Sequence, residues 1–198
     1  MLFFSILLVD QLLKLWVKTN LSIGDEIVIL NWFSLYFVEN NGFAFGWEFF
    51  GVWGKFFLTF FRIIFVGFIF NWFVGLVKDR VYFGVLVGFV LILGGAIGNI
   101  IDSVFYGVLF DYAPLFFGRV VDMFYFPIVS GFYPSWVPFL GGEDFVFFRF
   151  IFNIADSSIT IGAFLLLIFY NKINAPTVIA ESAMLKINLK KTNLSPPK

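Results

Sequence analysis

Four apolar stretches, each about long enough to cross a bilayer, most constrain what this chain can fold into. A hydrocarbon core of about 30 Å takes roughly 20 mostly apolar residues in a helix. The stretches run over 2–17, 56–77, 81–101 and 150–170. Hydrophobic residues make up 61% of the 198 residues and charged residues 13%, against about a quarter charged in soluble domains. We therefore expect an all-α polytopic membrane protein with four transmembrane helices.

The first stretch differs from the others because it contains Asp10, Gln11 and Lys14. It lacks the positive start and the small-residue cleavage site of a signal peptide, so we interpret it as a retained helix. Asp10 and Lys14 are four residues apart, which places them on one helix face where they can form an ion pair. Such a pair is as typical of a structural role as of a functional one.

Basic residues gather on one side of the four expected spans. The turn at 78–80 and the segment after residue 171 hold seven of the thirteen Lys and Arg residues, but only two of the thirteen acidic ones. The positive side of a membrane protein normally faces the cytoplasm. Both termini are therefore predicted to be cytoplasmic, with residues 1–171 forming one membrane domain and residues 172–198 a basic cytoplasmic tail.

The two long connections, 18–55 and 102–149, are predicted to face outward. Residues 26–38 are rich in β-branched and aromatic side chains, which predicts a small β-rich element outside the membrane. The second connection contains Pro127, Pro134 and many aromatic residues, so we expect a loop that lies on the outer membrane surface. Long connections of this kind usually carry function.

The chain contains no His and no Cys. This excludes Ser-His and Cys-His nucleophilic systems, His-ligated zinc and disulfides. No metal site and no cofactor are predicted. If the protein is an enzyme, its acid and its base must come from Asp, Glu, Lys or Tyr.

Polar residues that are costly in lipid converge on one expected membrane depth. They are Asp10 and Lys14 in the first span, Asn99 and Asp102 at the outward end of the third, Asp122 in the second outer connection, and Asn153 and Asp156 at the start of the fourth. Asn99 and Asp102 could instead cap a helix end, and Asn153 with Asp156 also fits a helix N-cap and first turn. Convergence from several segments nevertheless favours a functional site.

Five segments carry a family pattern in a fixed order. They are Asp10-Gln-x-x-Lys14, Glu39-Asn-x-Gly-x-Ala-Phe-Gly46, Gly94-Gly-x-x-Gly-Asn-x-x-Asp102, Val120-Val-Asp-Met123 and Phe152-Asn-x-Ala-Asp156. Together they resemble the lipoprotein signal peptidases, the signal peptidase II family. The resemblance covers nearly the whole chain before the tail. Each segment alone is weakly specific, whereas all five in family order on four spans are highly specific.

The resemblance implies an aspartyl endopeptidase of the bacterial inner membrane. Such an enzyme removes the signal peptide from diacylglyceryl-modified prolipoproteins by cleaving just before the lipidated Cys. It also implies that Asp122 and Asp156 are catalytic. Two carboxyls in one site cannot both ionise readily, so one would be the base for water while the other stays protonated and polarises the scissile carbonyl.

The resemblance also extends to substrate-binding or supporting residues and to partners. The matching positions are Asp10, Lys14, Asn40, Gly42, Asn99, Asp102, Asn153 and Ala155. The implied partners are lipid-modified prolipoproteins and membrane lipid, with no nucleic acid. The enzyme would act as a monomer after a prolipoprotein diacylglyceryl transferase.

Two departures from the family pattern stand out. Many members have Arg directly after the aspartate that matches Asp102, whereas this chain has Ser103. We expect Arg119 or Arg149 to replace that positive charge. The aromatic connection over 103–150 is also long for the family, and we expect it to modify a lid or the lipid contacts.

Two alternatives come from other mechanisms. A small proton-coupled carrier would also use intramembrane Asp and Lys, although carriers usually place them near the midplane. A Ser-Lys peptidase could use Lys14 with Ser157 or Ser158. Asp10 beside Lys14 favours the charged ammonium, which cannot act as a base.

Overall fold

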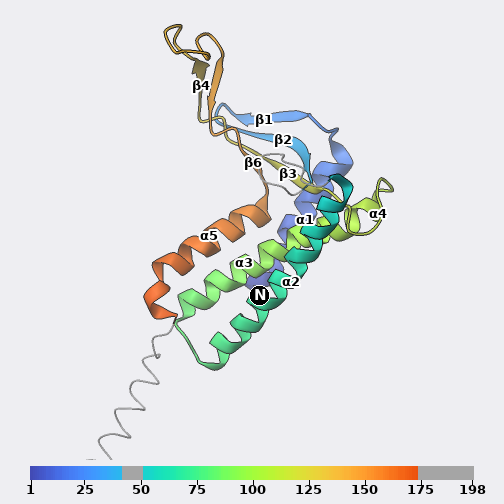
Figure 1. Ribbon diagram of the computed structural model, residues 1–198, viewed down its shortest axis with the longest axis vertical. Coiled ribbons are helices and arrows are strands. Elements are labelled where there is room, and N and C mark those ends of the chain that lie inside the picture. The colour runs from blue at the N-terminus through green and yellow to red at the C-terminus, as the bar shows by residue number, and fades with distance from the viewer. Residues whose placement is uncertain (42–50, 174–198) are drawn as a thin grey trace, which may run out of the picture.

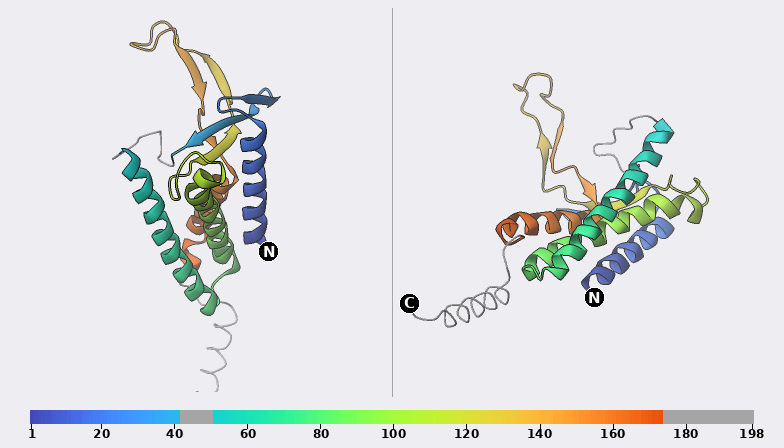
Figure 2. Two further views of the ribbon diagram at one scale, coloured as in Figure 1. Left: turned by 90° about the vertical axis from the view of Figure 1, so that its right-hand side faces the viewer. Right: turned by 60° about the horizontal axis from the view of Figure 1, so that its bottom comes forward.

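The computed structural model describes residues 1–41 and 51–173, so Gly42 and nearly all of the expected tail lie outside the described residues. Helix α3 (Phe83–Ile101) packs against the three other long helices. These are α1 (Leu2–Asn20), α2 (Gly51–Lys78) and α5 (Ile154–Ile168), which run alongside α3 in Figures 1 and 2. A short 3-10 helix, Tyr170–Lys172, follows α5.

All four expected spans are helices, with corrected ends. Helix α1 continues to Asn20, and α2 begins at Gly51, before the expected start. The expected start of the fourth span at residue 150 is wrong, because Asn153 caps α5 through a capping box with Asp156. The residues before this cap are extended and pair in a sheet.

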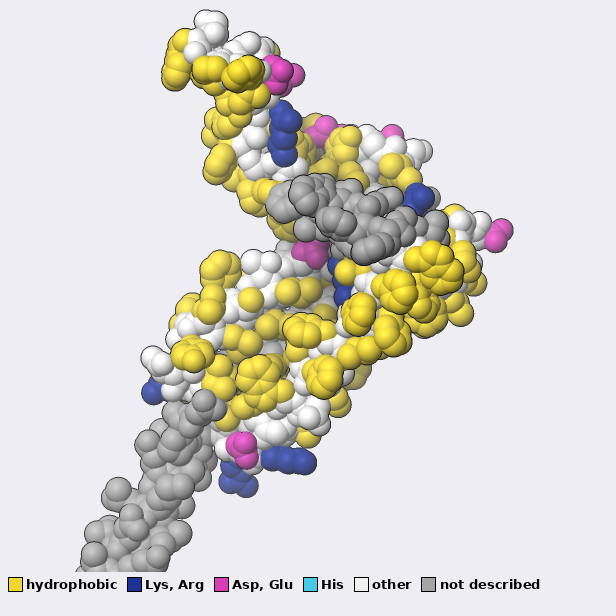
Figure 3. All heavy atoms as spheres, in the orientation of Figure 1, with side chains coloured by type: hydrophobic (Ala, Val, Ile, Leu, Met, Phe, Trp, Pro, Cys, Tyr) yellow, Lys and Arg dark blue, Asp and Glu magenta, His cyan; other side chains and the backbone are white. Residues whose placement is uncertain are grey.

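Two helical segments within the described residues are long and apolar enough to cross a membrane, Trp53–Lys78 and Phe83–Leu109. Helix α5 is apolar but shorter. Figure 3 shows hydrophobic side chains spread over the surface of the helical region. On α2 they include the exposed Phe60, Phe65 and Phe68, as expected of a helix surrounded by lipid.

The predicted β-rich element is an antiparallel sheet at one end of the helices (Figure 1). Its strand order is β1 (Glu26–Leu30), β2 (Phe33–Asn40), β3 (Val120–Tyr125) and β6 (Ile151–Phe152). Between the pairs Leu35–Phe124 and Val38–Asp122, strand β2 has one more residue than β3. This bulge lies next to Asp122 and bends the sheet there.

A small apolar core fixes the sheet to the helices. Val17 of α1, Phe37 of β2, and Val121 and Met123 of β3 are buried in one cluster with Tyr106. Because side chains alternate along a strand, Val121 and Met123 share one face of β3 and Asp122 lies on the other. The core therefore holds β3 in the register that sets the position of Asp122.

Helix α3 continues into a π-helix, η2 (Asp102–Tyr106), and a short helix, α4 (Gly107–Leu109). The chain then returns over η2, where the backbone of Gly118 passes close to Asp102. A Cβ at Gly118 would lie 2.2 Å from the carbonyl oxygen of Asp102, so only glycine fits there. π-helical segments often occur at functional sites, and in η2 both Asp102 and Ser103 are buried.

Strands β4 (Val129–Phe132) and β5 (Asp144–Phe147) form a separate hairpin, called the β4–β5 hairpin below. Figures 1 and 2 show it projecting from the sheet, away from the helices. Its side chains include the exposed Phe132, Trp136 and Phe139. The sequence predicted a loop on the membrane surface and did not predict a paired hairpin; contact with the membrane stays a prediction.

Candidate active site

Strand β3 presents Asp122 on the face opposite the core. The residue is 3% exposed, and its carboxyl accepts hydrogen bonds from two amides. Asn153 Nδ2 donates to Oδ1 at 2.7 Å, and Asn40 Nδ2 donates to Oδ2 at 3.3 Å. Asn40 belongs to the neighbouring strand β2, two residues beyond Val38, the partner of Asp122 in the ladder. The sheet thus supplies both Asp122 and one of its hydrogen-bond donors.

The first turn of α5 presents Asp156. Its backbone N–H donates to Asn153 Oδ1 at 2.9 Å, and the backbone N–H of Asn153 donates to Asp156 Oδ2 at 3.3 Å. Asn99 Nδ2 donates to Asp156 Oδ1 at 2.8 Å. A carboxylate in this position is also favoured by the helix dipole. Asn153 therefore caps the helix that holds Asp156 while its own side chain binds Asp122, which joins the two aspartates.

Burial and the neighbouring negative charge of Asp156 raise the pKa of Asp122 to about 7, although the bonds from Asn40 and Asn153 oppose the shift. A carboxyl with a raised pKa stays protonated up to higher pH. Asp122 therefore keeps its proton to higher pH than an ordinary aspartate does.

A buried ammonium beneath this pair orients Asn99. Lys14 Nζ lies 2.9 Å from Asp10 Oδ2 and 2.8 Å from Asp102 Oδ2, and it donates to Asn99 Oδ1 at 2.8 Å. Because an ammonium can only donate hydrogen bonds, the carbonyl of the Asn99 amide must face Lys14. The NH2 group of Asn99 must then face Asp156. The predicted Asp10–Lys14 pair is confirmed, and it belongs to a network that reaches the site.

The carboxylates of this network also hold the backbone beside each candidate catalytic residue. Asp10 Oδ1 accepts the N–H of Ala155 at 2.9 Å, one residue before Asp156. Asp102 Oδ2 accepts the N–H of Val121 at 3.4 Å, one residue before Asp122. Asp10, Lys14 and Asp102 are each fully or almost fully buried. The network therefore positions both aspartates through the chain as well as through Asn99.

Small residues allow both α5 and α1 to approach α3 closely here. A Cβ at Gly95 would lie 2.2 Å from the carbonyl oxygen of Ala155, and one at Gly98 would lie 2.7 Å from Asp10 Oδ2. Small residues commonly let membrane helices pack at short distance. Ala155 is itself fully buried against this face, which explains why the glycines of the 94–102 segment accompany the polar residues.

The expected replacement for the family arginine is wrong. Arg149 donates to the carbonyl of Asp144 on the hairpin, and the exposed Arg119 forms an ion pair with Glu39, with 3.3 Å between Nη1 and Oε2. The cation beside Ser103 is Lys55 of α2, whose Nζ donates to Ser103 Oγ at 3.1 Å. Sequence reasoning missed Lys55 because it falls one residue before the expected span. The sequence feature that could have identified Lys55 is an isolated Lys at the start of an apolar helix.

The Ser-Lys alternative finds no support in these contacts. Lys14 is surrounded by two carboxylates and the carbonyl of Asn99. Ser157 Oγ donates to the backbone carbonyl of Asn153, as helix serines commonly do. Neither arrangement gives a neutral amine next to a hydroxyl nucleophile.

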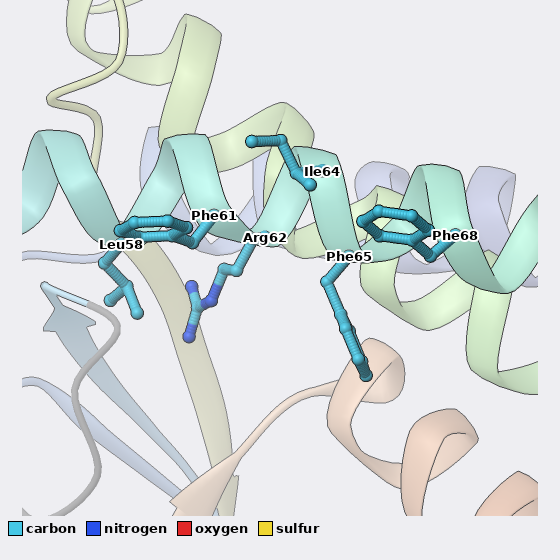
Figure 4. A pocket seen from close by; sticks show the side chains of 6 residues that line it. All are labelled: Leu58, Phe61, Arg62, Ile64, Phe65 and Phe68. Carbon is cyan, nitrogen blue, oxygen red and sulfur yellow. The ribbon is translucent and has the colours of Figure 1, made fainter.

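A hollow of about 390 Å³ lies beside α2 and is called the α2 hollow below. It is lined by Leu58, Phe61, Arg62, Ile64, Phe65 and Phe68 (Figure 4). Figure 4 shows Arg62 projecting from α2 on the same side as Phe65. The negative charges of Asp156 and Asp122 act on its guanidinium. The α2 hollow is therefore apolar, with a positive group directed to the vicinity of the two aspartates.

Comparison with known proteins places these features in a family. Residues 2–172 match the family described as signal peptidase (SPase) II. A lipoprotein signal peptidase of Porphyromonas gingivalis is 47% identical over 181 residues, with 83% of this chain and 79% of the relative covered. A lipoprotein signal peptidase of Amoebophilus asiaticus is 40% identical over 170 residues, with 81% and 72% covered.

Two solved structures described as bacterial membrane enzymes share the fold. The first has a TM-score of 0.58 and 26% identity, covering 100% of this chain and 91% of the other. The second has a TM-score of 0.55 and 28% identity, covering 84% and 88%. Together with the family match over nearly the whole described chain, these relatives show that the chain belongs to the signal peptidase II family and is an aspartic peptidase.

Proposed function

We propose that this protein removes the signal peptide from diacylglyceryl-modified prolipoproteins by cleaving just before the lipidated Cys, with Asp122 and Asp156 as the catalytic pair. The observation that carries the proposal is the position of the two carboxyls. They come from β3 and from the first turn of α5, and one residue, Asn153, binds both. The relatives in Porphyromonas and Amoebophilus are named as lipoprotein signal peptidases, which supports the substrate class.

The proposed mechanism needs no covalent intermediate. Asp156 takes a proton from water as the water oxygen attacks the scissile carbonyl, and Asp122 donates its proton to the carbonyl oxygen. When the C–N bond breaks, the leaving amine takes the proton that Asp156 received, and one hydroxyl of the collapsing gem-diol returns its proton to Asp122, which restores both carboxyls to their starting states. The pKa of about 7 for Asp122 fits the acid role, because that carboxyl is then substantially protonated near neutral pH.

Asn99 and Asn153 serve the base in this mechanism. Both donate hydrogen bonds to Asp156, Asn99 from its side chain and Asn153 from its backbone. These bonds stabilise the carboxylate and fix its direction before substrate arrives, so little reorganisation is needed at the moment of reaction. The same residues leave Asp156 partly exposed, which lets water reach it.

We propose that α1, α2, α3 and α5 all span the bacterial inner membrane. The polar residues of α1 are directed to its contact with α3, since Asp10 and Lys14 are buried there, which leaves apolar side chains such as Phe4, Leu8 and Leu12 exposed. The basic turn at 78–80 and both termini would face the cytoplasm. The sheet and the aspartates then lie at the outer face, and exposed aromatics of the β4–β5 hairpin would meet the outer membrane surface.

The α2 hollow suits the arrival of a substrate from the membrane. Its phenylalanine and leucine side chains offer an apolar lining, and Arg62 lies where both aspartates act on its charge. In the proposed complex, the signal helix and the diacyl chains stay in the bilayer beside α2. The peptide bond before the lipidated Cys then reaches the aspartates without leaving the membrane surface.

Amide substitution tests the catalytic pair. Asp122→Asn and Asp156→Asn keep the size of the side chain but remove the acid or the base, so each should abolish cleavage of a lipidated prolipoprotein in detergent. Asp111→Asn on the exposed loop after α4 is the matched control and should cleave at the wild-type rate. Melting temperature checks that the variants fold. Substantial cleavage by either folded dyad variant would contradict the proposal.

A further inference from the structure

Lys55 is a buried cation close to the network beneath the aspartates. Lys55 lies near the start of α2 and is 6% exposed. Its Nζ donates a hydrogen bond to Ser103 Oγ at 3.1 Å. Ser103 is fully buried on the π-helix and carries no charge. A buried ammonium is costly unless nearby negative charge balances it, so the charge of Lys55 calls for a partner beyond the hydroxyl.

The start of α2 is fixed so that Lys55 stays against Ser103. The Thr59 hydroxyl lies within 2.9 Å of the Lys55 carbonyl and 3.3 Å of the Phe116 carbonyl on the loop that covers η2. Phe56 stacks on Phe117 of the same loop with ring centroids 6.0 Å apart. These contacts bind one turn of α2 to the covering loop, and Lys55 stays buried beneath it.

The charges that face Lys55 come from three elements. Asp102, beside Ser103 on η2, attracts the ammonium, whereas Arg62 on the same helix and Arg119 before β3 repel it. Of these three charges, only that of Asp102 favours an ammonium at this position, against the burial of Lys55 and the repulsion from the two arginines.

Charge balance in the buried network also points to Lys55. Asp10 and Asp102 contribute two negative charges, and Lys14 between them contributes one positive charge. With all three ionised, the network carries a net charge of minus one in a buried site. A protonated Lys55 would make the sum zero.

We propose that Lys55, held by Ser103, is a positioning residue that neutralises the network and keeps Asp102 ionised, in the place of the arginine that many family members have at position 103. An ionised Asp102 binds Lys14 and the N–H of Val121, and these hold Asn99 and the strand that presents Asp122. In those family members the positive charge comes from the π-helix, whereas in this chain it comes from α2. The inference rests on the proposed function and names the residue that supports its site.

Relocating the charge tests this inference. Lys55→Met removes the charge with little change in volume, Lys55→Arg keeps it, and the double variant Lys55→Met with Ser103→Arg returns it from the π-helix. We expect Lys55→Met to lower kcat roughly 10-fold or more, with KM within about twofold, because the network acts on the catalytic groups and not on substrate binding. Lys55→Arg and the double variant should recover most of that loss.

Lys78→Met, at the exposed far end of α2, is the matched control and should behave as the wild type. The melting temperature in detergent gives a second readout: it should fall by several degrees in Lys55→Met and return in the double variant. Wild-type kcat and melting temperature in Lys55→Met would overturn the inference. A double variant that melts as low as Lys55→Met, or cleaves as slowly, would also overturn it.

The two readouts separate this inference from the proposed function. If the wild-type protein does not cleave a lipidated prolipoprotein, the proposed function fails, while the melting temperatures of the same variants still decide the role of Lys55. If the wild type cleaves and Lys55→Met cleaves equally well, only the role of Lys55 fails.

Discussion

The polar network beneath the aspartates and the β4–β5 hairpin are organised in opposite ways. In the network, Lys14 and the carboxylates around it are buried, and each has defined partners. On the hairpin, Phe132, Trp136 and Phe139 are 75%, 80% and 101% exposed. A buried polar group must be satisfied or it destabilises the fold, whereas an exposed aromatic side chain is under no such constraint. The network should therefore tolerate change poorly and the hairpin well.

Of the changes considered, removing the ammonium of Lys14 from the centre of the network should have the largest effect on stability and kcat. Lys14→Met leaves Asp10 and Asp102 buried without the cation between them, which typically costs about 3–5 kcal/mol. It also removes one of the two donors, Lys14 and Asn153, that hold the carbonyl of the Asn99 amide in place. We expect a lower melting temperature in detergent and at least roughly a 100-fold loss of kcat. Both are measured on purified protein with a lipidated prolipoprotein.

Lys172→Met is the control for this variant because Lys172 is exposed on the helix after α5. It should leave both quantities unchanged. If Lys14→Met instead cleaved at the wild-type rate, the network would be a structural feature unrelated to catalysis, and the comparison with the hairpin would lose its meaning.

Asn40→Ala should have a moderate effect that appears in the pH dependence. Rising pH through about 7 removes the proton of Asp122, so the wild-type rate should fall on the alkaline side. The bond from Asn40 stabilises the ionised carboxylate, and its loss raises the pKa of Asp122 further. The alkaline limb of kcat should therefore move to higher pH, by a few tenths of a unit to about one unit.

Ser34→Ala at the other end of β2 is the matched control, because Ser34 bonds to Glu26 and not to the site. Its alkaline limb should coincide with that of the wild type. A shift of the Asn40→Ala limb to lower pH would have the wrong sign for the proposed role of Asn40 and would argue against Asp122 as the acid.

Shortening the hairpin should have the smallest effect. Val129 and Phe147 pair across its base, so a two-residue turn can join them and delete the tip. Because the hairpin lies outside the four-stranded sheet that presents Asp122, kcat in detergent should stay within about threefold of the wild type. A loss as large as that in Lys14→Met would show that the hairpin belongs to the catalytic site after all.

Sequence patterns could predict the network because its members follow local rules. Asp10 and Lys14 are spaced for one helix face, and Asn153 with Asp156 has the spacing of a capping box. The ends of the apolar spans predicted that these residues lie at the same membrane depth. Local spacing and the span ends were together sufficient for this prediction.

Features that depend on distant contacts could not be predicted in this way. Lys55 meets Ser103 only because α2 begins early and packs on the loop that returns over η2. The bulge beside Asp122 arises from the register between β2 and β3, which the periodicity of either strand alone does not determine. The aromatic residues of the hairpin give the same signal whether they lie on a membrane or pair in a projecting hairpin.

The most direct test of the proposed function compares one prolipoprotein with and without its diacylglyceryl group, using purified enzyme and mass spectrometry of the products. The account predicts cleavage of the lipidated form just before the modified Cys and little or no cleavage of the unlipidated form. Equal cleavage of both forms, or cleavage at another bond, would contradict it, even if Asp122 and Asp156 proved essential.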